Sequence, residues 1–329
     1  MKRIFCSLSA ALLSLTLANA SPIQKHLVPN DARWVLHLDI ENFFSTQLGS
    51  FLKEEIIEKE FQEQVTMLQK FLTNDFSLSK LDSLTLYGTS FDDAGHEDFN
   101  GVILLKTQFD LEPVLDNLIE KSKQDNSLLI QTATTGQGTV YKYGKSLKDD
   151  AYGLVHEKRL LVLAKSSSRL KRALHTVQSQ DGQIETISSL KEFPPREPSF
   201  FFMAAAEGFN SIKLDQGPHA QVLKQTEKGR ILIGESNEHM FVDLLLQTEE
   251  TEGATKIHAI LSGIKALIQL SNPDPRLVEL VNAIDISVHN DSVHLHVRFP
   301  VKKAIETIRE EHHSASVSHE GISPLQIAG

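Results

Sequence analysis

His37 and Asp39 are the first residues whose types and spacing suggest chemistry; they lie in the run "RWVLHLDIENFF" (residues 33–44). Alternating side-chain types in this run predict a β-strand. Side chains two residues apart on a strand share a face, so Asp39 could orient the His37 imidazole. Such a pair is half of a nucleophilic triad, or two ligands of a metal site. Because no nucleophile or third ligand stands nearby in the sequence, the solvated side of an ordinary strand is the favoured interpretation.

A second candidate site lies in a predicted hairpin near the end of the chain. Its turn is centred on Asn290 and Asp291, because both residue types tolerate the backbone angles of a tight turn. This centring places Asp285 opposite His296, with His294 on the same face. Two histidines and an aspartate on one sheet face could hold a divalent ion. The competing interpretation is a polar face with ordinary Asp–His contacts, which the neighbouring positive charge of an arginine favours.

The remaining sequence carries no recognised catalytic or cofactor motif. G-x-S-x-G, H-E-x-x-H and EF-hand patterns do not occur. The segment "TGQGTVYKYGKS" (residues 135–146) lacks the spacing of a phosphate loop, so nucleotide binding is rejected. The sequence therefore predicts no cofactor.

The first twenty residues have the pattern of a secretory signal peptide. Lys2 and Arg3 precede an apolar stretch, and Ala18-Asn19-Ala20 is a small-residue cleavage site. We expect cleavage after Ala20 and a periplasmic or secreted product. The only cysteine, Cys6, would leave with this segment, so the mature chain would have no disulfide and no thiolate nucleophile.

The charge of the chain restricts its partners. Removing the signal peptide takes away two positive charges and no negative ones, which changes the formal net charge from −10 to −12. An acidic surface disfavours nucleic acid and anionic membranes. No second apolar stretch approaches twenty residues, so no membrane span is expected in the mature chain. A protein or a small ligand is the expected partner.

The pattern of apolar residues predicts an α+β protein with antiparallel sheets and helices packed on one face. A long amphipathic helix is expected over residues 43–72, and a helix capped by Asp110 follows. A basic helix is expected over residues 168–177. Strands are predicted at residues 81–88, 100–109, 127–133, 139–144, 152–157 and 159–165.

The chain also suggests an internal duplication. A stretch rich in Gly, Ser and Pro places a boundary near residue 195, which gives a first half at 21–195 and a second at 196–312. Segments of the two halves match in the same order: "WVLHLDIENF" with "FFFMAAAEGF", "LYGTS" with "LIGES", and "KRALHTV" with "KKAIETI". Residues 313–329 are polar and are expected to be a disordered tail.

The opening segment "VPNDARWVLHLDIENFFSTQLG", with "LDSLTLYG" and "GVILLK", resembles a family of exported bacterial proteins without an assigned activity. The most specific shared element is Trp34-x-x-His37-x-Asp39. The resemblance implies an exported, duplicated α+β protein and brings no catalytic residue. The favoured function is therefore a non-enzymatic binding or structural protein outside the cytoplasm. The alternative is an exported hydrolase or metal-dependent enzyme that uses His37 and Asp39.

Overall fold

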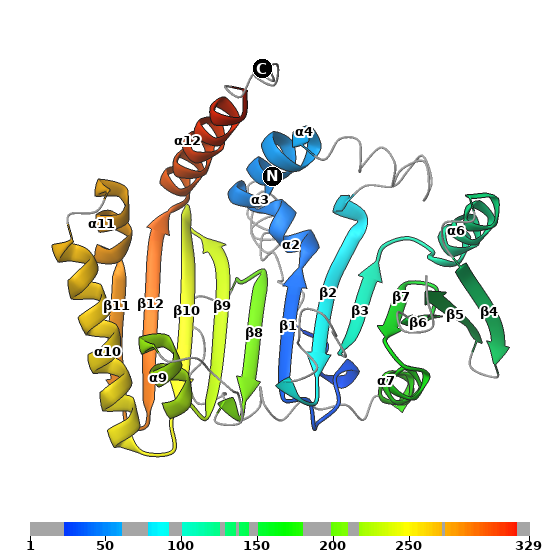
Figure 1. Ribbon diagram of the computed structural model, residues 1–329, viewed down its shortest axis with the longest axis horizontal. Helices are drawn as coiled ribbons and strands as arrows, with labels where there is room; N and C mark the ends of the chain where they lie inside the picture. The colour runs from blue at the N-terminus through cyan, green and yellow to red at the C-terminus, as the bar shows by residue number, and fades with distance from the viewer. Residues whose placement is uncertain are drawn as a thin grey trace, which may run out of the picture.

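The computed structural model describes residues 23–60, 78–91, 101–125, 129–135, 138–144, 151–179, 199–209, 217–271 and 274–320. A 12-stranded sheet runs through them in the order β11-β12-β10-β9-β8-β1-β2-β3-β7-β6-β5-β4 (Figure 1). Neighbouring strands are antiparallel, and helices accompany the sheet, so the chain has the α+β fold that the sequence predicts.

The strands are β1 (Trp34–Asp39), β2 (Leu81–Gly88), β3 (Val102–Thr107), β4 (Leu129–Thr135), β5 (Gly138–Gly144), β6 (Ala151–His156), β7 (Leu160–Ala164), β8 (Phe202–Glu207), β9 (Lys228–Ser236), β10 (His239–Gln247), β11 (Ile284–His289) and β12 (Ser292–Pro300). The main helices are α2 (Ile40–Ser45), α3 (Gln47–Phe51), α6 (Glu112–Asp125), α7 (Ser167–Ser179), α9 (Pro218–Gln225), α10 (Thr251–Leu270), α11 (Pro275–Asn282) and α12 (Val301–Glu320). Shorter segments are η1 (Lys25–Leu27), η2 (Leu52–Ile57), α4 (Glu58–Glu60) and η3 (Leu78–Lys80).

The two parts of the chain on either side of residue 195 share one sheet. Strands β1 and β8 lie side by side in its middle (Figure 1), and His37 faces Met203 across this pair. The Asp39 amide also donates to the carbonyl of Phe201 at 2.7 Å. The sequence predicts a separate sheet for each half; the structure joins them because the edge of β1 pairs with β8.

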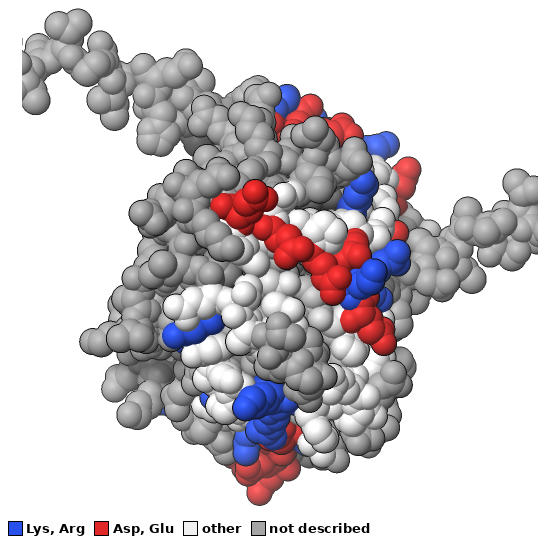
Figure 2. Space-filling view, turned by 90° about the vertical axis from the view of Figure 1, so that its right-hand side faces the viewer, with Lys and Arg blue, Asp and Glu red and all other residues white. Residues whose placement is uncertain are grey.

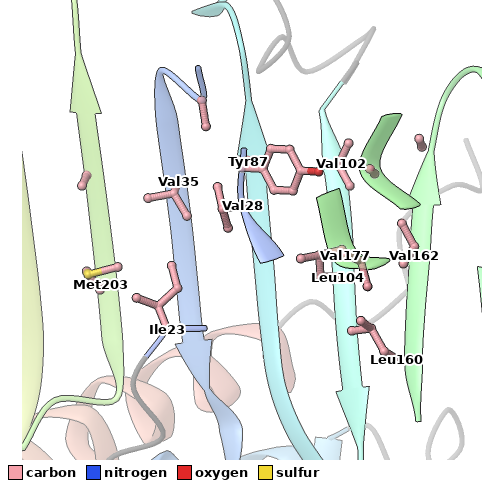
Figure 3. Packing of buried hydrophobic residues seen from close by; sticks show 14 of the residues in the cluster. Ile23, Val28, Val35, Tyr87, Val102, Leu104, Leu160, Val162, Val177 and Met203 are labelled. Atoms are coloured by element: carbon pink, nitrogen blue, oxygen red, sulfur yellow. The ribbon is translucent and has the colours of Figure 1, made fainter. Parts of the chain in front are cut away.

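Each face of the sheet is packed by its own helices. On one face, Val35, Val102 and Leu232 belong to a core cluster that contains residues of α7. On the other face, Leu246 and Val293 pack with residues of α10. Figure 3 shows the first cluster, in which side chains from β1, β2, β3, β7 and β8 meet α7 and the N-terminal segment. The larger core therefore spans both parts of the chain, and helices cover both faces rather than one.

Acidic side chains are prominent on one side of the molecule. Figure 2 shows the side of the molecule at the β4 end, where Asp and Glu side chains form a diagonal stripe; some basic side chains lie against its right-hand end and others lie elsewhere on this side. Among the described residues, no helix combines the length and the apolar character needed to cross a membrane.

One predicted helix and the predicted disordered tail differ from the structure. The helix expected to start at residue 43 and continue is broken at Thr46, which ends α2 and accepts a hydrogen bond from the Gly49 amide at 2.9 Å as the cap of α3. A hydroxyl that caps a new helix competes with continuation of the old one. The part of this prediction at 61–72 lies outside the described residues. Helix α12 runs to Glu320, so the start of the tail predicted at residue 313 is helical.

Other local predictions are confirmed. Strand β2 has the predicted bounds, and Asp110 accepts a hydrogen bond from the Glu112 amide at the start of α6 at 3.0 Å. The last hairpin turns at Asn290, which has a φ of 52°. Turn chemistry set by one or two residues can be predicted from sequence because it depends on local backbone angles.

Candidate functional site

The His37 and Asp39 side chains lie on the buried face of β1. His37 is 3% exposed and Asp39 is 2% exposed, whereas Leu36 on the opposite face is 37% exposed. The prediction that His37 lies on a solvated strand face is therefore wrong. The pattern is misleading because β1 is a central strand whose polar side chains face the core of α7 and the N-terminal segment.

Strand β2 supplies a hydroxyl partner for His37 that the sequence did not reveal. The Nδ1 atom of His37 lies 2.9 Å from Oγ1 of Thr85, which is its cross-strand neighbour. A hydroxyl beside an imidazole is the contact that an activated nucleophile needs. The adjoining cavity has a volume of only about 10 Å³, and its lining includes Leu27 and Val28 of the N-terminal segment. Since one water needs roughly 10–15 Å³, a substrate has no room here.

The Asp39 side chain stabilises the start of helix α2. Its carboxylate accepts a hydrogen bond from the Asn42 amide at 2.9 Å and forms the N-cap of α2. Capping satisfies one of the amide groups that a helix leaves without an intrahelical partner.

Replacing Asp39 tests whether this capping accounts for the residue. We expect Asp39→Ala to lower the free energy of unfolding by about 1–2 kcal/mol, because the cap is lost. Asp39→Asn keeps a capping oxygen and should lose less than half of that. Urea denaturation of both variants makes the comparison. Equal losses in the two variants would contradict a capping role and point to a need for the negative charge.

The second candidate site has the predicted register. Asp285 faces His296 across β11 and β12, as the centring of the turn requires. The two histidines nevertheless approach Asp243 of β10: Nε2 of His294 lies 3.0 Å and Nδ1 of His296 lies 3.7 Å from its Oδ2 atom. Asp285 is exposed. Among the described residues no group of three or more His, Cys, Asp or Glu side chains is arranged to hold a metal ion, so the proposed set gains no support.

Asp243 and Arg230 complete this polar cluster, and sequence reasoning missed both. Asp243 has no exposed surface, and its Oδ1 atom lies 3.9 Å from the Arg230 guanidinium. Burial lowers the pKa of Arg230 below its ordinary value, and attraction to Asp243 opposes this shift. The available signal was an aspartate between the apolar residues Phe241 and Leu245 on one face of β10.

The two candidate sites do not converge. His37 and His296 lie in one row across the sheet, with Met203, Leu232 and Asp243 between them on β8, β9 and β10. At about 4.8 Å between neighbouring strands, the two histidines are separated by roughly 19 Å. A single active site cannot contain both.

The opposite face of the central strands contains an open apolar pocket of about 580 Å³. Strands β1, β2, β8, β9 and β10 form its floor, and α9 contributes Leu223 to its wall. This volume lies in the range of pockets that hold small molecules. The floor side chains are Leu36, Leu86, Ala204, Ala206, Ile231 and Leu244.

Small residues on β8 make this pocket. Ala204 pairs with Leu36 of β1 and with Ile231 of β9, so a short side chain separates two large ones. The aromatic rings of Phe91 and Phe209 stand at one side with centroids 5.6 Å apart. Leu36 consequently keeps 37% of its surface exposed in the middle of the sheet.

The described side chains around the pocket direct no charged group into it. The Trp34 indole at its edge already donates from Nε1 to the Ser90 carbonyl at 2.8 Å. Arg230 contributes to the lining, but its guanidinium belongs to the Asp243 cluster on the other face. Burying a charge without a partner is costly, so the pocket suits a neutral apolar molecule.

Comparison with known proteins gives little further information. No protein-family model matches the chain, and no curated protein matches it. Two solved structures of TP0453 align loosely. Crystal form I has a TM-score of 0.45 at 11% identity and covers 88% of this chain and 97% of that one. Crystal form III has a TM-score of 0.48 at 11% identity and covers 86% and 96%. These similarities carry no functional conclusion.

Proposed function

We propose that the chain is an exported, non-enzymatic binding protein that holds a small neutral apolar molecule in the pocket over its central strands. The observation that carries the proposal is the pocket of about 580 Å³ with Leu36 exposed on its floor. Apolar surface in a concave site of this size is stabilised when a ligand covers it.

An enzyme built on His37 and Asp39 is the less favoured function. The Nδ1 atom of His37 is within hydrogen-bond distance of the Thr85 hydroxyl, and the Asp39 carboxylate caps α2. The adjoining cavity of about 10 Å³ leaves no position for a reacting group. Both residues are better explained by folding than by catalysis.

We also propose that the fold arose by duplication. Read outward from the β1–β8 pair, the first part begins with β1-β2-β3-β7-β6 and the second has β8-β9-β10-β12-β11. The first part then continues with β5 and β4, which have no counterpart among the described strands of the second. In both series the fourth place belongs to the strand that comes last in the chain. His37 also faces Met203, which the alignment of the two halves matches with it. These features support the proposal, and export rests on the signal-like first twenty residues.

The only tryptophan of the chain provides a direct test. Trp34 lines the pocket, so a bound fluorophore should quench its emission by energy transfer. N-phenyl-1-naphthylamine is neutral, and 8-anilino-1-naphthalenesulfonate adds a sulfonate to the same skeleton. We expect saturable quenching by the neutral probe, with an affinity at least about tenfold higher than that of the anionic probe, because the sulfonate would be desolvated without a partner.

Titrations of the mature chain at a fixed ionic strength would separate the outcomes. Quenching that fails to saturate would contradict a pocket of defined size. Tighter binding of the sulfonate would contradict a neutral ligand, since it requires a cation that faces the pocket, whereas the Arg230 guanidinium lies with Asp243 on the other face of the sheet.

A further inference from the structure

We propose a second binding site, for a small organic oxyanion with a phosphate or carboxylate group, at the N-terminal end of α7. It is a pocket of about 290 Å³ between α7 and the end of β2, on the sheet face opposite the apolar pocket. The proposal is independent of the function proposed for that pocket.

Helix α7 supplies the positive side of this second pocket. Ser168, Arg169 and Arg172 of its first two turns line the pocket. The first amides of a helix and its dipole favour a negative charge, and Arg recognises carboxylate and phosphate in a planar geometry. These features alone would not define a site, because many helices begin with basic residues.

Tyr87 provides the observation that points to a ligand. Its side chain is only 3% exposed and lines the pocket. Within the parts of the chain that the structure describes, its hydroxyl has no hydrogen-bond partner. Figure 3 shows the oxygen pointing along the sheet towards Val102, beneath α7. The hydroxyl of a tyrosine that is buried as a whole normally finds a partner, so a group that enters the pocket is the natural acceptor.

The protonation of Tyr87 suits an anionic acceptor. Burial raises the pKa of its hydroxyl well above the ordinary value; Arg172 opposes this shift and Asp31 adds to it. Tyr87 therefore stays protonated at neutral pH and can donate.

The local charge is an exception in this acidic chain. Two arginines, Arg169 and Arg172, line this pocket, and Arg172 pairs with Asp31 at 2.5 Å. The whole chain has a formal net charge of −10, and acidic side chains form the stripe seen in Figure 2. An anion entering the pocket would share Arg172 with Asp31 and accept from Tyr87. The apolar walls of Pro29 and Ala173 would contact the organic part of the ligand.

Isothermal titration of the full chain tests the site with three probes: inorganic phosphate, phenyl phosphate and benzoate. We expect saturable binding of phenyl phosphate or benzoate, and the tighter of the two identifies the preferred anion. Tyr87→Phe should weaken that binding roughly tenfold, since a hydrogen bond to a charged acceptor is lost. Its melting temperature should stay at the wild-type value or rise, because the hydroxyl has no described partner to lose.

Lys171→Gln is the matched control, because it removes one positive charge from an exposed residue of the same helix that does not line the pocket. It should leave the affinity within about twofold of wild type, whereas Arg172→Gln should weaken binding strongly. Three results would overturn the proposal: none of the probes binds at millimolar concentration, Tyr87→Phe binds as well as wild type, or Lys171→Gln weakens binding as much as Arg172→Gln.

Discussion

Replacing Asp243 by alanine should destabilise the fold by about 3–5 kcal/mol, because removal of one partner of a buried ion pair leaves the other charge uncompensated. Asp243 is completely buried, and the Arg230 side chain beside it is only 8% exposed. His294 would also lose the carboxylate that lies 3.0 Å from its Nε2 atom. The position is surrounded by core residues, since Phe241 and Leu245 on the same face are each 1% exposed.

Urea denaturation followed by far-UV circular dichroism would measure this loss. Glu252→Ala is the control, because it also removes a carboxylate from an ion pair, the one with Lys256, but Glu252 is 72% exposed. Exposed pairs contribute little, so the control should stay within about 0.5 kcal/mol of wild type.

The double variant Arg230→Met/Asp243→Leu separates charge from packing. It removes both charges, and it should regain most of the stability that Asp243→Ala loses, because a buried pair replaced by apolar residues is often tolerated. A loss below about 1 kcal/mol in Asp243→Ala would show that Arg230 does not depend on this carboxylate.

The sequence predicted features that depend on a few neighbouring residues. The last hairpin has the expected register because Asn290 and Asp291 determine its turn, and Asp285 therefore faces His296. Strand β2 also has the expected bounds, because its alternating apolar and polar side chains end at Gly88. The arrangement of each hairpin could be predicted without knowing what covers it.

The side of β1 that is buried depends on distant residues, and the sequence could not show it. Because His37 and Asp39 are polar, the sequence predicts that they face solvent. In the structure both are buried: the His37 ring contacts the Thr85 hydroxyl, and the Asp39 carboxylate accepts a hydrogen bond from the Asn42 amide. Leu36 lies on the opposite face of the strand, and its neighbour Ala204 of β8 leaves it 37% exposed. The pairing of β1 with β8 spans more than 160 residues, and no local pattern encodes it. For this reason the sequence suggested a site on the His37 face of the sheet, whereas the structure favours the pocket on the Leu36 face.

The pocket also depends on that pairing, because its floor combines strands from both parts of the chain. A ligand there would contact β1 and β2 on one side of the junction, and β8, β9 and β10 on the other. Binding would therefore stabilise the central sheet as a unit, since a ligand that binds only the folded state adds to its stability.

Filling the pocket should abolish its binding without unfolding the protein. In Ala204→Phe, the new ring would stand between Leu36 and Ile231 and occupy the floor of the pocket. We expect the affinity for N-phenyl-1-naphthylamine to fall about 100-fold or more, which corresponds to about 2.7 kcal/mol. The melting temperature should be unchanged or higher, because the added ring buries apolar surface in existing space.

A matched variant and a second pocket make this prediction decisive. Ala266→Phe introduces the same ring at an exposed position of α10 and should leave both the affinity and the quenching of Trp34 unchanged. Another apolar pocket, of about 520 Å³, lies between α11, α12 and β10. If folded Ala204→Phe still binds the probe with wild-type affinity, the probe occupies a site such as this one. This result would show that the central pocket is not the binding site, because filling it would not have changed the affinity for the probe.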